Sequence, residues 1–146
     1  IWRPAPADGI APADVPEPVG HLDIAPTILA AAGLDIPEVM QGRPLPRTPG
    51  DGSRERVVTE WIDTYDGNEI VMRTMVRDDY LVTAYEKTNR YDGSEGELYA
   101  LADDPQQWRN LWSDPGAATI KSDLLADMRD NVPDGREEPL EKIAPV

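Results

Sequence analysis

The sequence of 146 residues contains no cysteine, no phenylalanine and a single histidine, His21. Without cysteine there is no disulfide framework, no cysteine-ligated zinc or iron–sulfur site, and no thiol nucleophile. One histidine cannot supply a metal site built from several histidines. No apolar run approaches the ~20 residues that span a bilayer, and the first residues carry no signal-peptide pattern. These absences remove the common thiol, multi-histidine and membrane-spanning chemistries.

Positive charge is also scarce, since 14 lysines and arginines face 28 aspartates and glutamates, for a net charge of −14. DNA, RNA and anionic membrane surfaces are polyanions, so this balance argues against nucleic acid and membrane as partners. The length suits one domain of ordinary size. The 15 prolines and 11 glycines indicate many ordered turns in an acidic globular chain.

Proline-rich loops dominate the first part of the chain. Residues 1–4, Ile-Trp-Arg-Pro, are typical of the end of a strand, and residues 5–18 read as an extended loop punctuated by proline. Residues 34–55 return to loop chemistry, with four prolines and three glycines.

A single helix is expected between these loops. From Leu22 to Ala32 apolar residues recur every three or four positions, which predicts one buried face. Asp23 is a natural N-cap, Pro26 falls in the first turn where its missing N–H costs little, and Gly33 can end the helix. The predicted buried face consists of Leu22, Ala25, Ile28 or Leu29, and Ala32.

The hydrophobic period changes to two after residue 55, which indicates strands. Strands are predicted at 56–62, 70–76, 80–85 and 97–101. A turn is expected at residues 63–68 and a tight turn at Asp78-Asp79. Strands that follow one another through short turns pair antiparallel.

A second helix is predicted after Ser113-Asp114-Pro115, where a capping residue precedes a proline in the first turn. Ile120, Leu124 and Met128 are spaced to share one face that can pack on a sheet. Residues 133–146 are expected to form an extended tail. The chain is therefore predicted to be α+β, with a small antiparallel sheet of about four strands packed on a C-terminal helix, preceded by one core helix.

No catalytic set emerges from the residues alone. His21 and the four serines could be arranged as a Ser-His-Asp triad in almost any fold, so a surface histidine before a helix is the plainer interpretation. Residues 63–69 lack the alternating oxygen ligands and the later glutamate of a calcium-binding EF-hand loop. The tryptophans at 61, 108 and 112 could stack on a ligand, but aromatic residues beside a small sheet more often belong to the core. The sequence contains no P-loop and no dinucleotide-binding fingerprint.

Two motifs occur in order along the chain. The first is Asp-x-x-Pro-Thr within residues 19–27, followed by Gly33 and by Gly-x-x-Leu from Gly42; the second is GELYALADDPQQWRNL at 96–111. Together they resemble the C-terminal part of a sulfatase, an arylsulfatase-like member of the alkaline phosphatase-like superfamily. The resemblance is carried by Asp23, Pro26, Thr27, Gly33, Pro37, Gly42, Leu45, Glu97, Leu98, Tyr99, Leu101, Asp104, Pro105, Asn110 and Leu111. The chain departs from the family pattern at the surface or turn positions Leu81, Ala100 and Gln107.

The resemblance implies an α/β fold overall, of which this chain would be the C-terminal part. Residues 1–55 would be the end of the α/β core, 56–132 an antiparallel-sheet-plus-helix subdomain, and 133–146 an extended tail. Most of the motif residues would then be structural. The structural set implied is Asp23, Pro26, Thr27, Gly33, Gly42, Leu98, Tyr99, Asp104, Pro105, Asn110 and Leu111.

Sulfatases hydrolyse sulfate esters with a formylglycine made in a Cys/Ser-x-Pro-x-Arg motif, beside a divalent cation that is usually calcium. The nearest pattern here, Ser113-x-Pro115, has Ala117 where the arginine belongs. No catalytic residue, metal ligand or cofactor is therefore expected in this chain. Calcium (or another divalent cation) and formylglycine are implied for the complete enzyme.

The resemblance thus implies a structural, pocket-bordering segment that is inactive alone. Its partners would be the N-terminal catalytic portion and, in the complete enzyme, a small-molecule sulfate ester. His21, Trp61 and Tyr65 are the predicted border of the substrate pocket. Two alternatives stay open: a segment of a phosphonate or phosphate ester hydrolase of the same superfamily, and a free-standing, non-catalytic interaction module whose apolar helix would need a partner or self-association to cover it.

Overall fold

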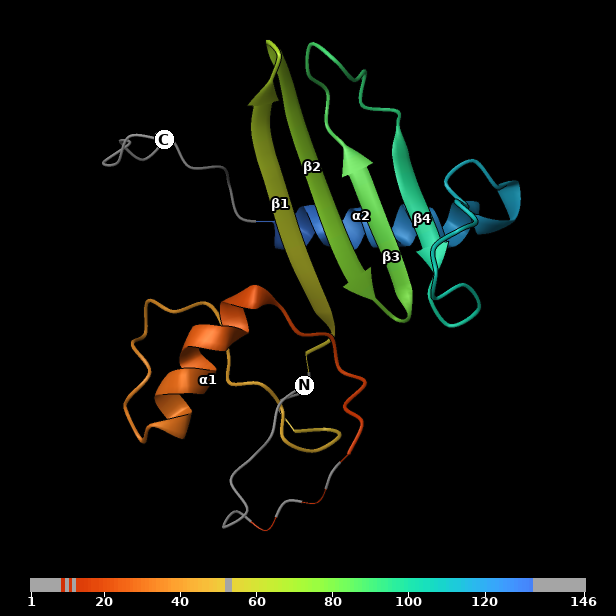
Figure 1. The fold of residues 1–146 in the computed structure, drawn as a ribbon. Helices are drawn as coiled ribbons and strands as arrows, with labels where there is room; N and C mark the ends of the chain where they lie inside the picture. The colour runs from red at the N-terminus through yellow and green to blue at the C-terminus, as the bar shows by residue number, and fades with distance from the viewer. Residues whose placement is uncertain (1–8, 10, 12, 52–53, 133–146) are drawn as a thin grey trace.

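The computed structural model describes residues 9, 11, 13–51 and 54–132 (Figure 1). The strand end expected at residues 1–4 and the tail expected at 133–146 lie outside the described residues. The elements in chain order are the 3-10 helix η2 (His21–Asp23), α1 (Ile24–Ala31), β1 (Arg56–Tyr65), β2 (Asn68–Arg77), β3 (Tyr80–Tyr85), β4 (Gly96–Ala100), the 3-10 helix η3 (Pro115–Ala117) and α2 (Ala118–Asn131). The predicted α+β fold class is confirmed.

The four strands form one antiparallel sheet in the order β1-β2-β3-β4. A two-residue turn joins β1 to β2, with φ of 50° at Asp66 and 73° at Gly67, values that match the twist of paired strands. The turn predicted at 63–68 is therefore too long. Its polar residues are strand residues on a protruding hairpin, where both faces are solvated. The tight turn at Asp78-Asp79 and the strand at 80–85 form as predicted.

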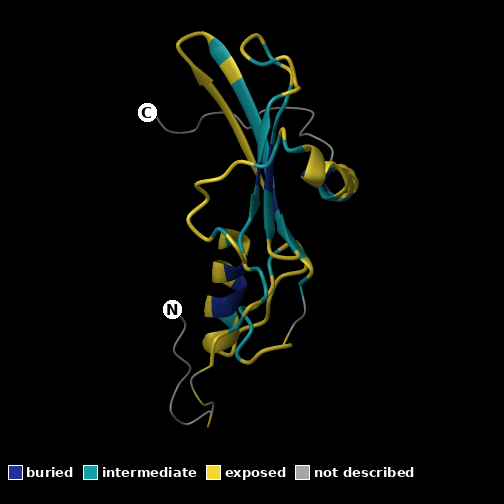
Figure 2. Ribbon diagram, turned by 90° about the vertical axis from the view of Figure 1, so that its right-hand side faces the viewer, coloured by how far each residue is buried: buried dark blue, intermediate teal, exposed yellow. Residues whose placement is uncertain are grey.

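The core lies between the sheet and α2. Val58, Met75, Val82 and Leu98 stand opposite one another across the four strands, so their side chains share one face. Met75, Val82 and Leu98 are fully buried there, together with two helix residues, Leu124 and Met128. Figure 2 views the sheet edge-on, with α2 on one side of it. The predicted packing of the second helix is confirmed.

The predicted buried face of α1 is wrong. Leu22 and Ile28 are each 61% exposed, whereas Asp23, Pro26 and Thr27 are buried. The reason is that the following loop packs against the polar side of this helix, and no described residue covers its apolar side. Among the described residues, no helix is both long and apolar enough to cross a membrane.

Candidate functional site

The first motif clamps a loop onto α1. Asp23 and Thr27 lie one helical turn apart on the same face, and both are buried. Asp23 accepts hydrogen bonds from the backbone N–H groups of Gly20 (2.8 Å) and Arg43 (2.9 Å), and from a guanidinium nitrogen of Arg54 (2.7 Å). The Thr27 hydroxyl donates to the carbonyl of Asp23 and accepts from the N–H of Leu45 at 2.8 Å. The Asp-x-x-Pro-Thr pattern therefore satisfies backbone groups of residues 43–45.

Gly42 is required by this clamp for a steric reason. A Cβ at this position would lie 1.9 Å from the carbonyl oxygen of Leu22, which no side chain could tolerate without backbone movement. Gly33, with φ of 68°, ends the helix in the left-handed conformation. The next N–H, that of Leu34, donates to the carbonyl of Leu29 at 2.9 Å. The backbone thus explains both glycines of the first motif: a close approach at Gly42 and a left-handed conformation at Gly33.

The second motif closes the outer edge of β4. The Asn110 side chain accepts hydrogen bonds from the N–H of Leu98 (3.1 Å) and of Trp112 (2.9 Å), and donates to the carbonyl of Gly96 (3.3 Å). The N–H of Leu111 donates to the carbonyl of Leu98 at 2.8 Å. Leu111 then packs against the core. β4 ends at Ala100, one residue before the predicted end of this strand, and Leu101 lies outside the buried cluster.

Asp104 organises the turn between these two parts of the motif. Its carboxylate accepts from the N–H groups of Arg109 (2.8 Å) and Trp108 (3.1 Å), and these hydrogen bonds lower the pKa of Asp104. Pro105 is exposed and follows directly. The chain reverses here and returns to cover β4.

Trp112 fills the space beside β4. A Cβ on Gly96 would lie 2.4 Å from the Trp112 ring and 2.5 Å from the carbonyl oxygen of Thr83. The indole N–H donates to the carbonyl of Ser94 at 2.8 Å, and the ammonium of Lys121 lies 4.7 Å from the ring centroid. The ring is thereby fixed between β4 and α2.

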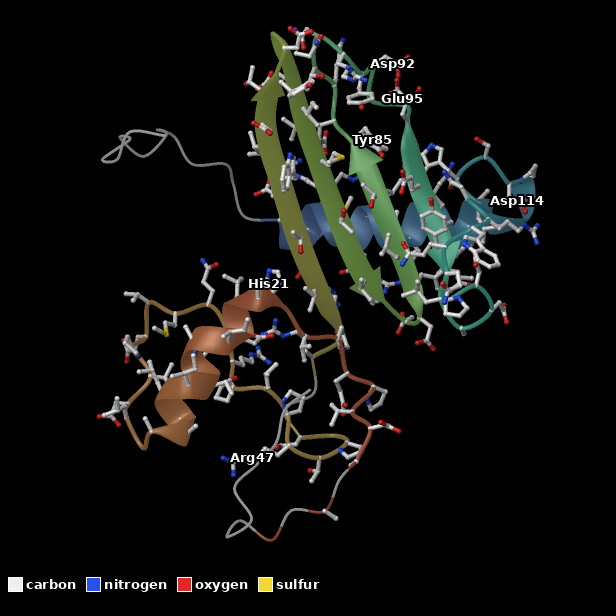
Figure 3. All side chains as sticks on the ribbon, in the orientation of Figure 1. His21, Arg47, Tyr85, Asp92, Glu95 and Asp114 are labelled. Carbon is white, nitrogen blue, oxygen red and sulfur yellow. The ribbon has the colours of Figure 1, made fainter. Side chains whose placement is uncertain are left out.

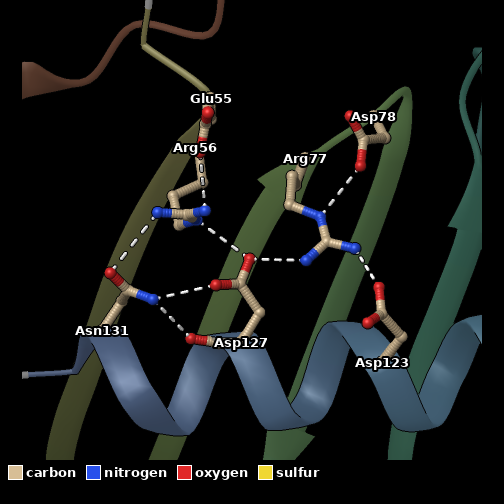
Figure 4. Close-up of polar contacts among 7 residues, drawn as sticks. All are labelled: Glu55, Arg56, Arg77, Asp78, Asp123, Asp127 and Asn131. Carbon is tan, nitrogen blue, oxygen red and sulfur yellow. Dashed lines mark hydrogen bonds and ion pairs between the residues drawn. The ribbon is translucent and has the colours of Figure 1, made fainter.

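An ion network ties α2 to the first two strands (Figure 4). The carboxylate of Asp127 bonds Arg56 at 2.9 Å and Arg77 at 2.6 Å, and Arg77 also pairs with Asp123. Burial acts to raise the pKa of Asp127, but the hydrogen bonds from Arg77 and Arg56 outweigh it and the pKa is lowered. Asn131 adds hydrogen bonds to Asp127. The network fixes the position of the helix on the sheet.

The sheet face opposite α2 carries aromatic and hydroxyl side chains. Glu97 accepts from the phenol of Tyr85 (2.8 Å) and of Tyr99 (3.3 Å). Burial, followed by this contact with Glu97, raises the pKa of Tyr85 to about 12. Thr74 and Thr83 share a hydrogen bond of 2.9 Å on the same face. These phenols stay protonated at neutral pH and cannot act as bases there.

The structure does not bring the three predicted pocket residues together. Trp61 and Tyr65 share the face of β1 that points away from α2, and they are 57% and 72% exposed. His21 is exposed next to Gly20, which lies against Val57 at the beginning of β1 (Figure 3). Tyr65 lies eight positions after Val57 along the strand, which is about 27 Å at ~3.4 Å per residue.

The described residues offer no catalytic constellation. Across residues 9, 11, 13–51 and 54–132, no group of three or more His, Asp or Glu side chains could hold a metal ion. The cleft beside Glu17, Asp23 and Arg54 encloses about 10 Å³, the space of about one water. Ser113 precedes a helix cap, in which the Asp114 carboxylate accepts from the N–H of Gly116. What the two motifs do here is satisfy backbone groups.

Sequence reasoning missed two features. The pairing of Asp23 with Arg54 joins residues 31 positions apart and leaves no local signal. The ion network did leave a local signal in the sequence. Asp123 and Asp127 lie four residues apart on α2, and arginines flank the strands that this helix covers.

Residues 6–133 match the family of N-sulphoglucosamine sulphohydrolase C-terminal segments. The uncharacterized sulfatase YidJ of Escherichia coli is 29% identical over 129 residues, covering 82% of this chain and 24% of YidJ. Two solved structures, a protein of Bacteroides thetaiotaomicron assigned as a sulfatase and the 2-O GAG sulfatase BT1596, are each 28% identical and give TM-scores of 0.64 and 0.63. Each match extends over 74% of this chain and over 23% of the solved structure's chain.

BT4656, whose structure holds its substrate D-glucosamine-2-N,6-O-disulfate, shares the fold with a TM-score of 0.55 at 21% identity, over 79% of this chain and 25% of its own. The chain spans about a quarter of the length of these relatives. The family match covers most of the chain, and the motifs and the sheet-plus-helix fold agree with it. The chain belongs to the sulfatase family as an N-sulphoglucosamine sulphohydrolase C-terminal segment.

Proposed function

We propose that this chain is the C-terminal segment of a hydrolase that cleaves sulfate esters, and that it acts structurally within that enzyme. The observation that carries the proposal is the match of residues 6–133 to a family of C-terminal segments. In agreement with this match, the chain covers only about a quarter of its sulfatase relative. The contacts of the two motifs support a structural role, since Asp23, Thr27 and Asn110 bind backbone groups within the chain.

The nucleophile and metal of the reaction belong to the rest of the enzyme. The described residues do not fit a divalent cation, because they form no cluster of three ligands. They do not fit the formylglycine motif either, because Ser113 lacks the arginine and Asp114 is occupied as a helix cap. Calcium (or another divalent cation) and formylglycine would therefore act from the N-terminal catalytic portion, which we propose as the partner of this segment.

The surface around α1 supports this partnership. Seven large apolar residues between positions 19 and 39 are exposed: Val19, Leu22, Ile24, Ile28, Leu34, Ile36 and Val39. No charged residue occurs from Ile24 to Leu34, in a chain whose residues are 29% charged. Exposed apolar surface of this extent usually marks a contact with another part of the protein or with a partner. Residues 1–55 would accordingly complete the α/β core, and 56–132 would form the subdomain beside it.

The proposed substrate is a small-molecule sulfate ester, since the relatives are sulfatases and one is a 2-O GAG sulfatase. His21, Trp61 and Tyr65 would border its pocket from this segment. Their exposure supports that role, because each is available to a partner surface or a ligand.

The test uses the protein encoded by the whole reading frame. It should hydrolyse an aryl sulfate faster than an aryl phosphate, whereas the 146-residue chain alone should hydrolyse neither. Trp61→Ala should change the preference among sulfated substrates, and Trp108→Ala, which removes a side chain 86% exposed beyond β4, should not. Preference for the phosphate would favour the phosphate or phosphonate hydrolase, and a reading frame without a Cys/Ser-x-Pro-x-Arg motif would favour the free-standing module.

A further inference from the structure

The two edges of the sheet differ in how they are protected. The outer edge of β4 is closed, because Leu98 and Gly96 exchange hydrogen bonds with Asn110 and Leu111. The outer edge of β1 is open over ten residues, and among the described residues no other element pairs with it. Unpaired strand edges are a liability that proteins usually cover.

The backbone groups that β1 presents outward follow from its register. The two-residue turn makes Tyr65 and Asn68 the closing hydrogen-bonded pair, and such pairs alternate along an antiparallel ladder. Trp61 and Asp63 therefore bond to β2, while the N–H and C=O of Glu60 and Ile62 point outward. The N–H of Thr64 points the same way and is bonded by the Asp63 carboxylate at 2.7 Å.

The sequence of β1 contains three charged residues, Arg56, Glu60 and Asp63, but few of the other devices that protect an edge strand. Residues 56–65 contain no proline, glycine or lysine, and the register with β2 runs through ten pairs without a bulge. Trp61 and Ile62 are 57% and 66% exposed on opposite faces of the strand. The edge is thus regular, and Trp61 and Ile62 give it exposed apolar surface against which another strand could pack.

We infer that β1 pairs through its outer edge with an extended segment of the catalytic portion, which adds a fifth strand to the sheet. This inference rests on the proposed function, because this chain covers only about a quarter of each relative that it matches. The segment that leads into α1 also lies against the beginning of β1. Gly20 lies against Val57 (a Cβ there would be 3.3 Å from a Val57 methyl), and Figure 1 shows α1 beside the beginning of β1. One partner can therefore cover both.

Residue-resolved hydrogen exchange on the full-length enzyme tests the pairing. The amides of Glu60 and Ile62 should exchange about a hundredfold or more slower than in a free peptide, as in any paired strand. The amides of Trp61 and Asp63, which β2 already protects, are internal controls. Free-peptide rates at Glu60 and Ile62 in an enzyme that hydrolyses aryl sulfates would overturn the pairing and leave the proposed function standing. Loss of sulfatase activity in the full-length protein would instead contradict the proposed function.

Two variants of Ile62 separate the backbone from the side chain. Ile62→Pro removes one outward N–H and leaves the bonds to β2, so it should raise exchange at Glu60 about tenfold, the loss expected for one hydrogen bond of ~1.4 kcal/mol. Ile62→Ala keeps the N–H and should leave that exchange unchanged. Equal exchange in the two variants would contradict strand addition. The same amides can be measured in the 146-residue chain alone. If they were protected there and the chain had a dimeric mass, the edge would pair with a second copy, and the assignment to the catalytic portion would be wrong.

Discussion

The side-chain oxygen of Asn110 lies 3.1 Å from the backbone nitrogen of Leu98, and this hydrogen bond replaces the neighbouring strand that β4 lacks. Asn110→Ala would leave the buried N–H of Leu98 without an acceptor. We expect a loss of about 1–3 kcal/mol in the free energy of unfolding, measured by urea denaturation. Ser122→Ala, at an exposed position of α2, is the matched control and should change stability by less than about 0.5 kcal/mol. Equal stability of both variants would contradict the role of Asn110.

Gly96→Ala should also destabilise the sheet. Its Cβ would lie 2.4 Å from the Trp112 ring and 2.5 Å from the carbonyl oxygen of Thr83, so both the ring and the backbone must move. Overpacking of this kind costs about 1–3 kcal/mol, which thermal unfolding will detect. Gly116→Ala is the control, because its Cβ would meet only the Asp114 carboxylate, at 3.2 Å. If the Gly96→Ala variant had the wild-type melting temperature, the Trp112 ring would be shown to move aside without cost.

The Asp127 carboxylate should make the stability of the fold depend on pH. Its pKa is lowered in the folded chain, because the hydrogen bonds from Arg77 and Arg56 outweigh burial, which acts in the opposite direction. Its contribution is therefore complete above the pKa of an unfolded aspartate, about 3.9, and is lost as pH falls through the lower folded pKa. Asp127→Asn should lower stability at pH 7 by about 2 kcal/mol and flatten the acid dependence below about pH 4.

Urea midpoints at pH 7 and at pH 3 measure both effects of Asp127. Asp130→Asn changes an exposed carboxylate of the same helix and should follow the wild-type acid dependence. If the Asp127→Asn variant lost as much stability at low pH as the wild type does, other carboxylates would be responsible for the acid dependence.

The hydroxyl of Thr27 holds the loop that follows α1. Thr27→Val keeps the shape but leaves the N–H of Leu45 without its acceptor at 2.8 Å. A cost of ~1.4 kcal/mol for local opening corresponds to about tenfold faster tryptic cleavage at the Arg47–Thr48 bond. Thr27→Ser retains the hydroxyl and should be cleaved at the wild-type rate. Equal cleavage of the two variants would count against the clamp.

Local sequence patterns predicted the sheet and α2 well. The strand Tyr80–Tyr85 and the turn at Asp78-Asp79 follow from alternation and turn chemistry, which act over few residues. The extension of β1 to Tyr65 was missed because Asp63 and Thr64 are polar on a hairpin that is solvated on both faces. Polarity there reflects exposure and not the end of the strand.

The surroundings of α1 could not be predicted from the sequence. Helical periodicity identified an apolar stripe through Leu22 and Ile28, but burial of that stripe depends on what packs against it. The polar pair Asp23 and Thr27 is buried instead, because residues 43–45 return to it across about twenty positions. The family resemblance identified these residues, and only the three-dimensional contacts gave their physical role.

The order β1-β2-β3-β4 means that each strand pairs with the one next to it in the sequence. Such pairings close short loops, so little chain entropy is lost before contacts form, and folding is correspondingly fast. The covering helix α2 is the next α-helix in the chain after the sheet. During synthesis the sheet can therefore assemble strand by strand as it leaves the ribosome, and the docking of α2 completes it without waiting for contacts from distant parts of the chain.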